Sequence, residues 1–279
     1  MAQTIAILGA TGKTGREVLQ RLLHRQDVNI QIYVRSTSKL VALFPSLPSN
    51  PRVSIFQGPL GDVENMRKCL NGAEQIVFTL GENDNLPGVS VIEDGARTVV
   101  AALEALRDDQ VGDWRRPRVL LLSSATWNPT LAAVRPALIH WAIKTAFVHP
   151  YADLRRGQEV FLTAAAAASS LVSVLLVQPN GLIEDEPSGH EISVDHATFS
   201  VTYGDLGAAF VDLACMREFD DLPAVGVSSK NGDNGLKYGP ILGYRIVRGL
   251  CATYIPGFWH MHRLAMSVVA TLSFKKKVQ

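Results

Sequence analysis

Apolar positions recur along this chain with two different periods. The run at residues 4–8 (Thr-Ile-Ala-Ile-Leu) predicts a buried strand, and Val18, Leu19 and Leu22 after it share one face of a predicted helix. Similar strand patterns follow at 29–34, 53–57, 75–81, 118–122, 171–177 and 224–228. Helical patterns lie between them at 63–70, 89–106 and 151–170, and residues 140–144 within the segment 127–149 are also predicted to be helical. Strands that alternate with helices predict an α/β fold with a mainly parallel sheet.

Three glycines separate the first predicted strand from the first predicted helix. Gly9, Gly12 and Gly15 would turn the chain, admit a diphosphate close to the backbone and let the helix pack on the strand. The free N–H groups of the helix start would then bind phosphate. A tight turn without a ligand is the alternative, but the strand and helix on either side favour a nucleotide loop. Its predicted residues are Gly9, Thr11, Gly12, Lys13, Thr14 and Gly15.

The end of the second predicted strand indicates which cofactor is bound. In dinucleotide folds an acidic residue here binds the ribose 2′-hydroxyl, whereas an arginine accommodates a 2′-phosphate. This chain has Arg35, followed by Ser36 and Lys39. A guanidinium can pair with two phosphate oxygens, and the serine and lysine add donors. The pattern therefore favours NADP(H) over NAD(H), with a solvated basic loop as the alternative.

The spacing Gly-x-x-Gly-x-x-Gly, with Ala10-Thr11 after the first glycine, resembles the atypical and extended short-chain dehydrogenase/reductases, especially the NmrA-like branch. The resemblance implies a Rossmann-type doubly wound parallel sheet with a small C-terminal substrate-capping part. We expect a single NAD(P)-binding domain over 1–279, with a dinucleotide-binding core at 1–182 and a substrate-facing cap at 183–279. Chains with a similar apolar cap occur among fungal biosynthetic reductases.

The same resemblance implies further cofactor contacts after three of the strands. Leu60 would lie near the adenine, because Pro59 stands where the family has an aspartate. Leu80 and Gly81 would pass beneath the diphosphate and ribose. The segment around Pro179, Asn180 and Leu182 resembles an Arg-Pro-Gly-Gly segment that flanks the nicotinamide, and Asn180 would contact the carboxamide or a substrate.

Two segments resemble the family's catalytic motifs. Ser124, in Ser-Ser-Ala, matches a serine that binds the substrate oxygen; the alternative is a loop cap. Tyr151 and Arg155 lie where the family has Tyr-x-x-x-Lys, so Arg155 would bind the ribose and supply positive charge, but an arginine cannot shuttle protons. Lowering the tyrosine pKa from about 10 to 7 needs roughly 4 kcal/mol. Tyr151 is either a proton donor or a residue packed beside the cofactor.

His140 and Lys144 share a helix face, and the histidine is structural or a proton donor.

Composition excludes several other classes. The net charge of +1 gives no global field that would attract nucleic acid. Cys69, Cys215 and Cys251 are far apart, which argues against disulfides and zinc and fits a cytoplasmic setting. His260 and His262 lack a third nearby ligand, so no metal is expected. The apolar stretch 264–274 is too short to span a membrane, no signal peptide is evident, and 275–277 (Lys-Lys-Lys) predict a solvated tail.

These patterns predict an NADPH-dependent oxidoreductase that reduces a carbonyl, enone or imine of a largely apolar small molecule. Two alternatives use the same nucleotide site. One is a non-catalytic NADP sensor of the NmrA type that binds a protein partner, and the other is a non-redox isomerase or cyclase. The substrate, the reaction direction and the assembly state, including a homodimer, stay open.

Overall fold

Strands and helices alternate along most of the chain. The computed structural model describes residues 2–110, 112–132, 136–167, 170–264 and 266. The strands are β1 Gln3–Leu8, β2 Val28–Val34, β3 Val53–Gln57, β4 Gln75–Phe78, β5 Arg118–Leu122, β6 Ser173–Pro179, β7 Gly181–Ile183, β8 His190–Ser193, β9 Ser200–Thr202 and β10 Ala224–Ser229. The helices are α1 Lys13–His24, α2 Thr37–Leu43, α3 Val63–Leu70, α4 Val91–Asp109, α5 Ala137–Ala146, α6 Val148–Ala166, α7 Tyr203–Cys215 and α8 Gly235–Tyr254.

The main sheet has the strand order β3-β2-β1-β4-β5-β6-β10-β8. Every pair is parallel except β10 with β8, and β7 pairs with β9 in a separate small sheet. Successive strands run outward from β1 on one side and from β4 on the other, so the order reverses between these two neighbours. Ligands of such sheets bind in the crevice at this reversal, beyond the carboxyl ends of the strands. The Rossmann-type doubly wound α/β fold expected from the sequence is confirmed.

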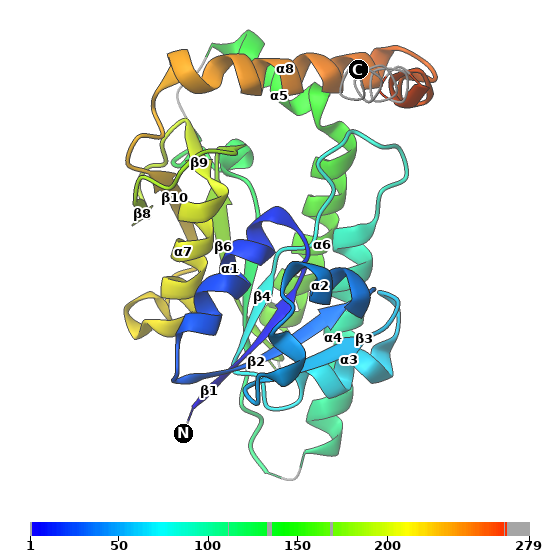
Figure 1. The fold of residues 1–279 in the computed structure, drawn as a ribbon, viewed down its shortest axis with the longest axis vertical. Coiled ribbons are helices and arrows are strands. Elements are labelled where there is room, and N and C mark those ends of the chain that lie inside the picture. Colours follow the sequence, from blue (N-terminus) through cyan, green and yellow to red (C-terminus); the bar gives the residue numbers. More distant parts are fainter. Residues whose placement is uncertain (1, 111, 133–135, 168–169, 265, 267–279) are drawn as a thin grey trace, which may run out of the picture.

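Alternate side chains of each strand build two cores, one on each face of the sheet. Ile5 and Ile7 of β1 lie in the core that α1 and α7 cover. Ala6 and Leu8 lie in the opposite core, together with apolar residues of α3, α4 and α6. Figure 1 shows these two groups of helices on either side of the strands. The central strands are therefore buried on both faces, which explains their nearly continuous apolar sequences.

The sheet does not end with the six strands before residue 183. β10 pairs with β6 through Ala224–Val227, and Leu206 and Phe210 of α7 are fully buried against the sheet. Residues beyond 182 thus contribute β10 and α7 to the main sheet and its covering layers. They also form α8, which crosses the end of the molecule beside α5 in Figure 1. The two helices meet closely at Gly249, where an added Cβ would lie 2.8 Å from the Ala146 side chain.

Some sequence expectations concern the C-terminus. Residues 267–279, including the predicted lysine tail and most of the apolar stretch 264–274, lie outside the described residues. Within the described part, no helix combines the length and the hydropathy needed to cross a bilayer.

Candidate nucleotide-binding and catalytic site

The turn between β1 and α1 requires glycine at two positions. Gly9 has φ +96°, and a Cβ there would lie 2.8 Å from the backbone carbon of Thr79. A Cβ on Gly15 would lie 2.7 Å from the carbonyl carbon of Gly9. Thr79 is itself fixed, because its backbone N–H and its hydroxyl both donate to the Leu8 carbonyl, at 2.9 and 3.0 Å. Thr79, directly after β4, therefore lies so close to the loop that only glycine fits at position 9.

The start of α1 fits an anionic ligand. Gly12 is the N-cap and, among the described residues, no side chain caps the helix and no acidic residue occupies its first turn. The N–H of Gly12 bonds the Gly9 carbonyl at 2.8 Å, which shapes the loop but leaves the first N–H groups of the helix available. A glycine cradle in which a Cβ would clash, followed by an uncapped helix start, suits the pyrophosphate of a dinucleotide.

Lys13 connects this loop to the opposite wall of the crevice. Its ammonium forms an ion pair with Glu184, which follows β7, and Arg245 of α8 lies 3.9 Å from the same carboxylate. The hydrogen bond from Lys13 lowers the pKa of Glu184 below its usual value. The ion pair of Lys13 with Glu184 therefore joins the glycine loop to the C-terminal part of the chain.

The end of β2 presents exposed basic side chains. Arg35 and Lys39 are exposed, and in the described chain neither forms an ion pair. Ser36 has a structural task, because its hydroxyl caps α2 by accepting from the N–H of Lys39 at 3.2 Å and lies 2.9 Å from the Ser38 hydroxyl. Of the predicted 2′-phosphate ligands, the two cations are thus available, while Ser36 is partly engaged.

Tyr33 fixes the turn that contains Leu60. Its hydroxyl donates to the Pro59 carbonyl at 2.8 Å, and burial raises its pKa to about 12, so it stays protonated. Leu60 is half-buried in this turn. In the loop after β4, Leu80 packs against the α3–α4–α6 core, and Gly81 follows it at the surface.

Beyond β5, three hydroxyl groups form a chain. The Ser124 hydroxyl donates to Thr126 Oγ1 at 3.0 Å, and Thr126 Oγ1 lies 3.0 Å from the Tyr151 hydroxyl. Ser124 and Thr126 are buried, at 9% and 5% exposure, and Tyr151 is half-buried. The structure therefore brings the two predicted residues together through Thr126. Sequence reasoning missed Thr126, although it stands two residues after Ser124 in the same short turn.

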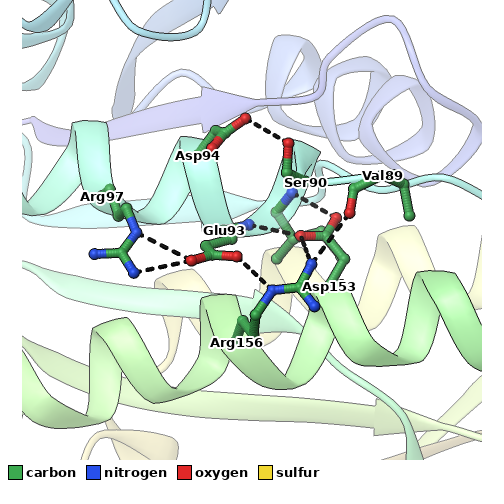
Figure 2. A network of polar contacts seen from close by, with 8 residues as sticks. Val89, Ser90, Glu93, Asp94, Arg97, Asp153 and Arg156 are labelled. Atoms are coloured by element: carbon green, nitrogen blue, oxygen red, sulfur yellow. Dashed lines mark hydrogen bonds and ion pairs between the residues drawn. The ribbon is translucent and has the colours of Figure 1, made fainter. Parts of the chain in front are cut away.

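Asp153 determines where Tyr151 lies. This carboxylate is fully buried and accepts the backbone N–H groups of Ile92 and Glu93, at 2.9 and 3.0 Å. It thus caps α4 from the neighbouring helix α6, and α4 begins at Val91 rather than at the expected residue 89. Figure 2 shows the carboxylate pointing at the helix start. Tyr151 stands two residues earlier on α6 and is fixed by the same contact.

Glu93 joins the same two helices at their surface. Its carboxylate pairs with Arg97 of α4 at 2.9 Å and with Arg156 of α6, as Figure 2 shows. These hydrogen bonds lower the pKa of Glu93. Arg156 also donates to the Val89 carbonyl at 3.2 Å. The network anchors the start of α6, which carries Tyr151.

Trp127 is surrounded by charged and aromatic side chains. The Lys144 ammonium lies 4.0 Å from the centre of its ring, and the Arg155 guanidinium lies 5.2 Å from it. The Tyr151 ring meets the indole nearly edge-on, with 6.2 Å between ring centres. Arg155 is therefore next to Tyr151, as its position one helical turn later requires, and its cation faces the indole.

The end of β6 is held by amide side chains. Asn180 Nδ2 donates to the carbonyls of Leu131, Ala197 and Thr198, at 3.2, 3.3 and 2.9 Å. Pro179 is buried and Leu182 half-buried on either side of it. Gln178 accepts from Asn128 at 2.8 Å. The Asn180 amide thus connects the end of β6 to the loop that contains Leu131 and to the loop that contains residues 197–198.

A hollow of about 1160 Å³ lies elsewhere, at the amino ends of β4, β5 and β6. Its walls include Arg67, Gln75, Trp114 and Arg118. The glycine loop and the hydroxyl chain follow the carboxyl ends of their strands, where ligands of parallel sheets bind, so we place the candidate site there. Among the described residues, no group of three or more His, Cys, Asp or Glu side chains could hold a metal ion.

Comparison with known proteins agrees with this geometry. The family described as NAD(P)H-binding matches residues 9–214, which include the glycine loop and the hydroxyl chain. This chain belongs to that family. The resemblance expected from the sequence is confirmed.

Several named relatives cover most of the chain. Oxidoreductase stcQ of Emericella nidulans is 38% identical over 75% of this chain and 76% of its own length. Oxidoreductase GME11367 of Pestalotiopsis microspora is 32% identical over 91% of this chain and 95% of its own. A short-chain dehydrogenase/reductase from Veillonella parvula, solved in complex with NADP, superposes with TM-score 0.64 at 17% identity, over 84% of this chain and 97% of that one. At this identity the last match supports the fold alone.

Proposed function

We propose that this protein is an NADPH-dependent oxidoreductase that reduces a carbonyl, enone or imine of a largely apolar small molecule. The chain of hydroxyls from Ser124 through Thr126 to Tyr151 carries the proposal. It lies at the same edge of the sheet as the glycine loop, where a nicotinamide ring would meet a substrate. The relatives named oxidoreductases, at 38% and 32% identity, support the same class of activity.

The cofactor assignment rests on two observations. The glycine cradle and the uncapped start of α1 suit a pyrophosphate. Arg35 and Lys39, exposed after β2, suit a ribose 2′-phosphate, and the acidic residue that would favour NAD(H) is absent from this position of the sequence. When bound, NADPH would supply the hydride. Leu80, Gly81, Pro179 and Leu182 would line its path.

The hydroxyl chain is arranged for proton donation. The Tyr151 phenol would donate its proton to the substrate atom on which negative charge develops. Ser124 would donate a hydrogen bond to the same atom after its O–H turns from Thr126 toward the substrate, because a hydroxyl has a single proton to donate. Thr126, between them, holds both hydroxyls in place. Arg155 is always protonated, so it would stabilise negative charge on the Tyr151 oxygen by its field, without exchanging a proton itself.

This arrangement favours an enzyme over a sensor. A sensor needs the nucleotide loop but no chain of buried hydroxyls at the substrate side. Burial alone does not require catalysis, because each of these hydroxyls is hydrogen-bonded and Ser124 also caps the turn after β5 by accepting the N–H of Thr126 at 3.3 Å. The non-redox isomerase would share the hydroxyls, so turnover of NADPH is what separates the two enzyme hypotheses.

NADPH oxidation in the presence of hydrophobic ketones, enals and imines tests the proposal. We expect Tyr151→Phe and Ser124→Ala to lower kcat by about 100-fold or more, as for the loss of a general acid. The control Tyr244→Phe removes an exposed hydroxyl on α8 and should leave the rate unchanged. Full activity of both site variants would remove the hydroxyl chain from the mechanism.

A further inference from the structure

The exposed side chains of α8 are apolar or aromatic with one exception. Leu236, Val247 and Tyr254 are 95%, 59% and 63% exposed. Val247 and Tyr254 follow Leu236 by 11 and 18 residues, which correspond to three and five whole turns, so the three side chains share one face of the helix. Lys237 is the one charged residue among the exposed positions of α8. A surface helix ordinarily has polar residues toward solvent, so α8 shows the reverse pattern.

The opposite face of α8 is fixed to the rest of the protein. Tyr238 and Arg245 lie about half a turn around the helix axis from Leu236. The Tyr238 hydroxyl donates to the Asp185 carboxylate at 2.8 Å, and the Arg245 guanidinium donates to the Leu182 carbonyl. The apolar face therefore points away from the segment 182–185 and does not form the wall of the candidate site.

Apolar exposure continues next to α8. Met261 and Leu264, in the segment after the helix, are exposed. α5, which packs against α8 at Gly249, exposes Leu138 and Trp141. A large apolar surface on a folded protein marks a contact with a partner or a membrane. Tryptophan and tyrosine among these residues are typical of the boundary between a membrane and water.

The same end of the chain lacks acidic residues. Residues 234–279 contain seven Lys and Arg and no Asp or Glu. Three of the seven form ion pairs with acidic residues of other segments, namely Lys237, Arg245 and Arg248. The other four are Arg263 and the lysines at 275–277. The net charge of the whole chain is only +1, so this positive surplus is local.

We propose that the outer face of α8 and the segment after it dock on the surface of an anionic lipid membrane. The face from Leu236 to Tyr254 is about 27 Å long and would lie in the plane of the interface, with its apolar side chains among the acyl chains. The basic residues that follow would attract acidic headgroups. The proposal is independent of the proposed function, because it needs no bound nucleotide.

A second copy of this chain fits the face less well than a membrane does. Two copies that met through this face would bring their basic segments together, and neither segment supplies an Asp or Glu to pair with them. Acidic headgroups supply the missing negative charge, and the acyl chains supply the apolar environment. The charge of the segment therefore favours the lipid surface.

Flotation of the full chain with lipid vesicles tests the docking. Vesicles of phosphatidylcholine alone are compared with vesicles that contain about 30% phosphatidylserine. We expect binding to the second kind to be about tenfold tighter or more at about 0.1 M salt, and the difference to shrink at about 0.5 M salt, because salt screens surface charges. Lys275→Gln, Lys276→Gln and Lys277→Gln together should reduce the preference.

Glutamate substitutions test which face docks. Leu236→Glu places a carboxylate on the outer face and should weaken binding to the phosphatidylserine vesicles by about tenfold or more. Its Tm should equal that of the wild type, because a leucine that is 95% exposed has few contacts to lose. Val247→Glu should act in the same way. Val63→Glu is the same change at an exposed position of α3, and this control should bind vesicles like the wild type.

Three results would overturn the proposal. The first is no binding to either kind of vesicle, or equal binding to both. The second is an equal effect of Leu236→Glu and Val63→Glu, because the added charge would then act without regard to the face. The third comes from sedimentation velocity: a wild-type dimer that Leu236→Glu dissociates, without vesicle binding, would assign the face to a second copy.

Discussion

Arg35 is the residue on which cofactor choice depends in this account. Its guanidinium is exposed after β2, at the position where dinucleotide folds distinguish a 2′-hydroxyl from a 2′-phosphate. The side chain has no carboxylate partner in the described chain, so the phosphate would not compete with an existing ion pair. The neighbouring Ser36 differs, because its hydroxyl already caps α2.

We expect Arg35→Ala to weaken NADPH binding by about 10- to 100-fold and to leave NADH binding nearly unchanged. The loss corresponds to one charge-assisted, bidentate contact with the phosphate. Fluorescence titration with both nucleotides measures it, and NADH is the internal control. An equal loss of affinity for NADH and NADPH would show that Arg35 does not bind the 2′-phosphate.

Residue roles could be predicted from the sequence only where a short motif fixes the backbone. Gly9 and Gly15 are of this kind, because their spacing between a strand and a helix implies the close contacts seen with Thr79 and Gly9. Thr126 was not predictable, since its role depends on a contact with Tyr151, 25 residues away. Asn180 was expected to contact the carboxamide or a substrate, and this stays a prediction. The contacts of its amide with three backbone carbonyls on two other loops left no signal in the sequence.

At the scale of elements, α4 and α6 form the support of the site. Asp153 is fully buried and bonds two backbone N–H groups at the start of α4. A buried carboxylate in this position also interacts favourably with the helix dipole. The start of α6, with Tyr151 and Arg155, is therefore positioned by its contact with another helix.

Asp153→Ala should lower the free energy of unfolding by about 2–3 kcal/mol, because two buried N–H groups lose their acceptor. Urea denaturation measures the change. Glu159→Ala, on the exposed side of the same helix, is the control and should fall within about 0.5 kcal/mol of the wild type. A similar, small effect of both substitutions would mean that Asp153 does not hold the helices together.

Glu93 makes the contact between α4 and α6 sensitive to acid. Hydrogen bonds from Arg97 and Arg156 lower its pKa below the ordinary value of 4.5. A carboxylate with a lowered pKa stabilises the folded state above its unfolded pKa, and this contribution is lost as the pH falls through the folded value. We expect Arg156→Met to reduce the Tm at pH 7 and to have less effect below about pH 4. A reduction that is independent of pH would contradict the ion pair as its cause.

The order of elements was easier to predict than their partners. The first six strands and the helices between them have periodic patterns and neighbours close in sequence. β10 was also expected as a strand, but its pairing with β6 joins residues about 50 apart and crosses β7, β8 and β9. The helix expected over residues 89–106 begins at Val91, because the carboxylate that caps it comes from α6. Such long-range contacts leave no local signal.

The whole molecule combines a nucleotide-binding sheet with a C-terminal helix that crosses one end of it. α8 is tied to the sheet side through the loop after β4: Asn85, which is 1% exposed, donates to Thr253 at 2.8 Å and accepts from the N–H of His149 at 3.0 Å. Arg248 pairs with Asp84 in the same loop. α8, which would contact a substrate, is thus fixed to the loop after β4, which would contact the cofactor.

Calorimetric titration of NADPH tests the central claim, that the loop from Gly9 to Gly15 binds the pyrophosphate of this nucleotide. We predict that the wild type and Gly61→Ala, whose added Cβ meets no atom within 4 Å, bind one NADPH per chain. Gly15→Ala should lose this binding, because its Cβ would clash with the Gly9 carbonyl. If the folded wild type takes up no NADPH at millimolar concentration, or if Gly15→Ala binds it equally well, the account is wrong.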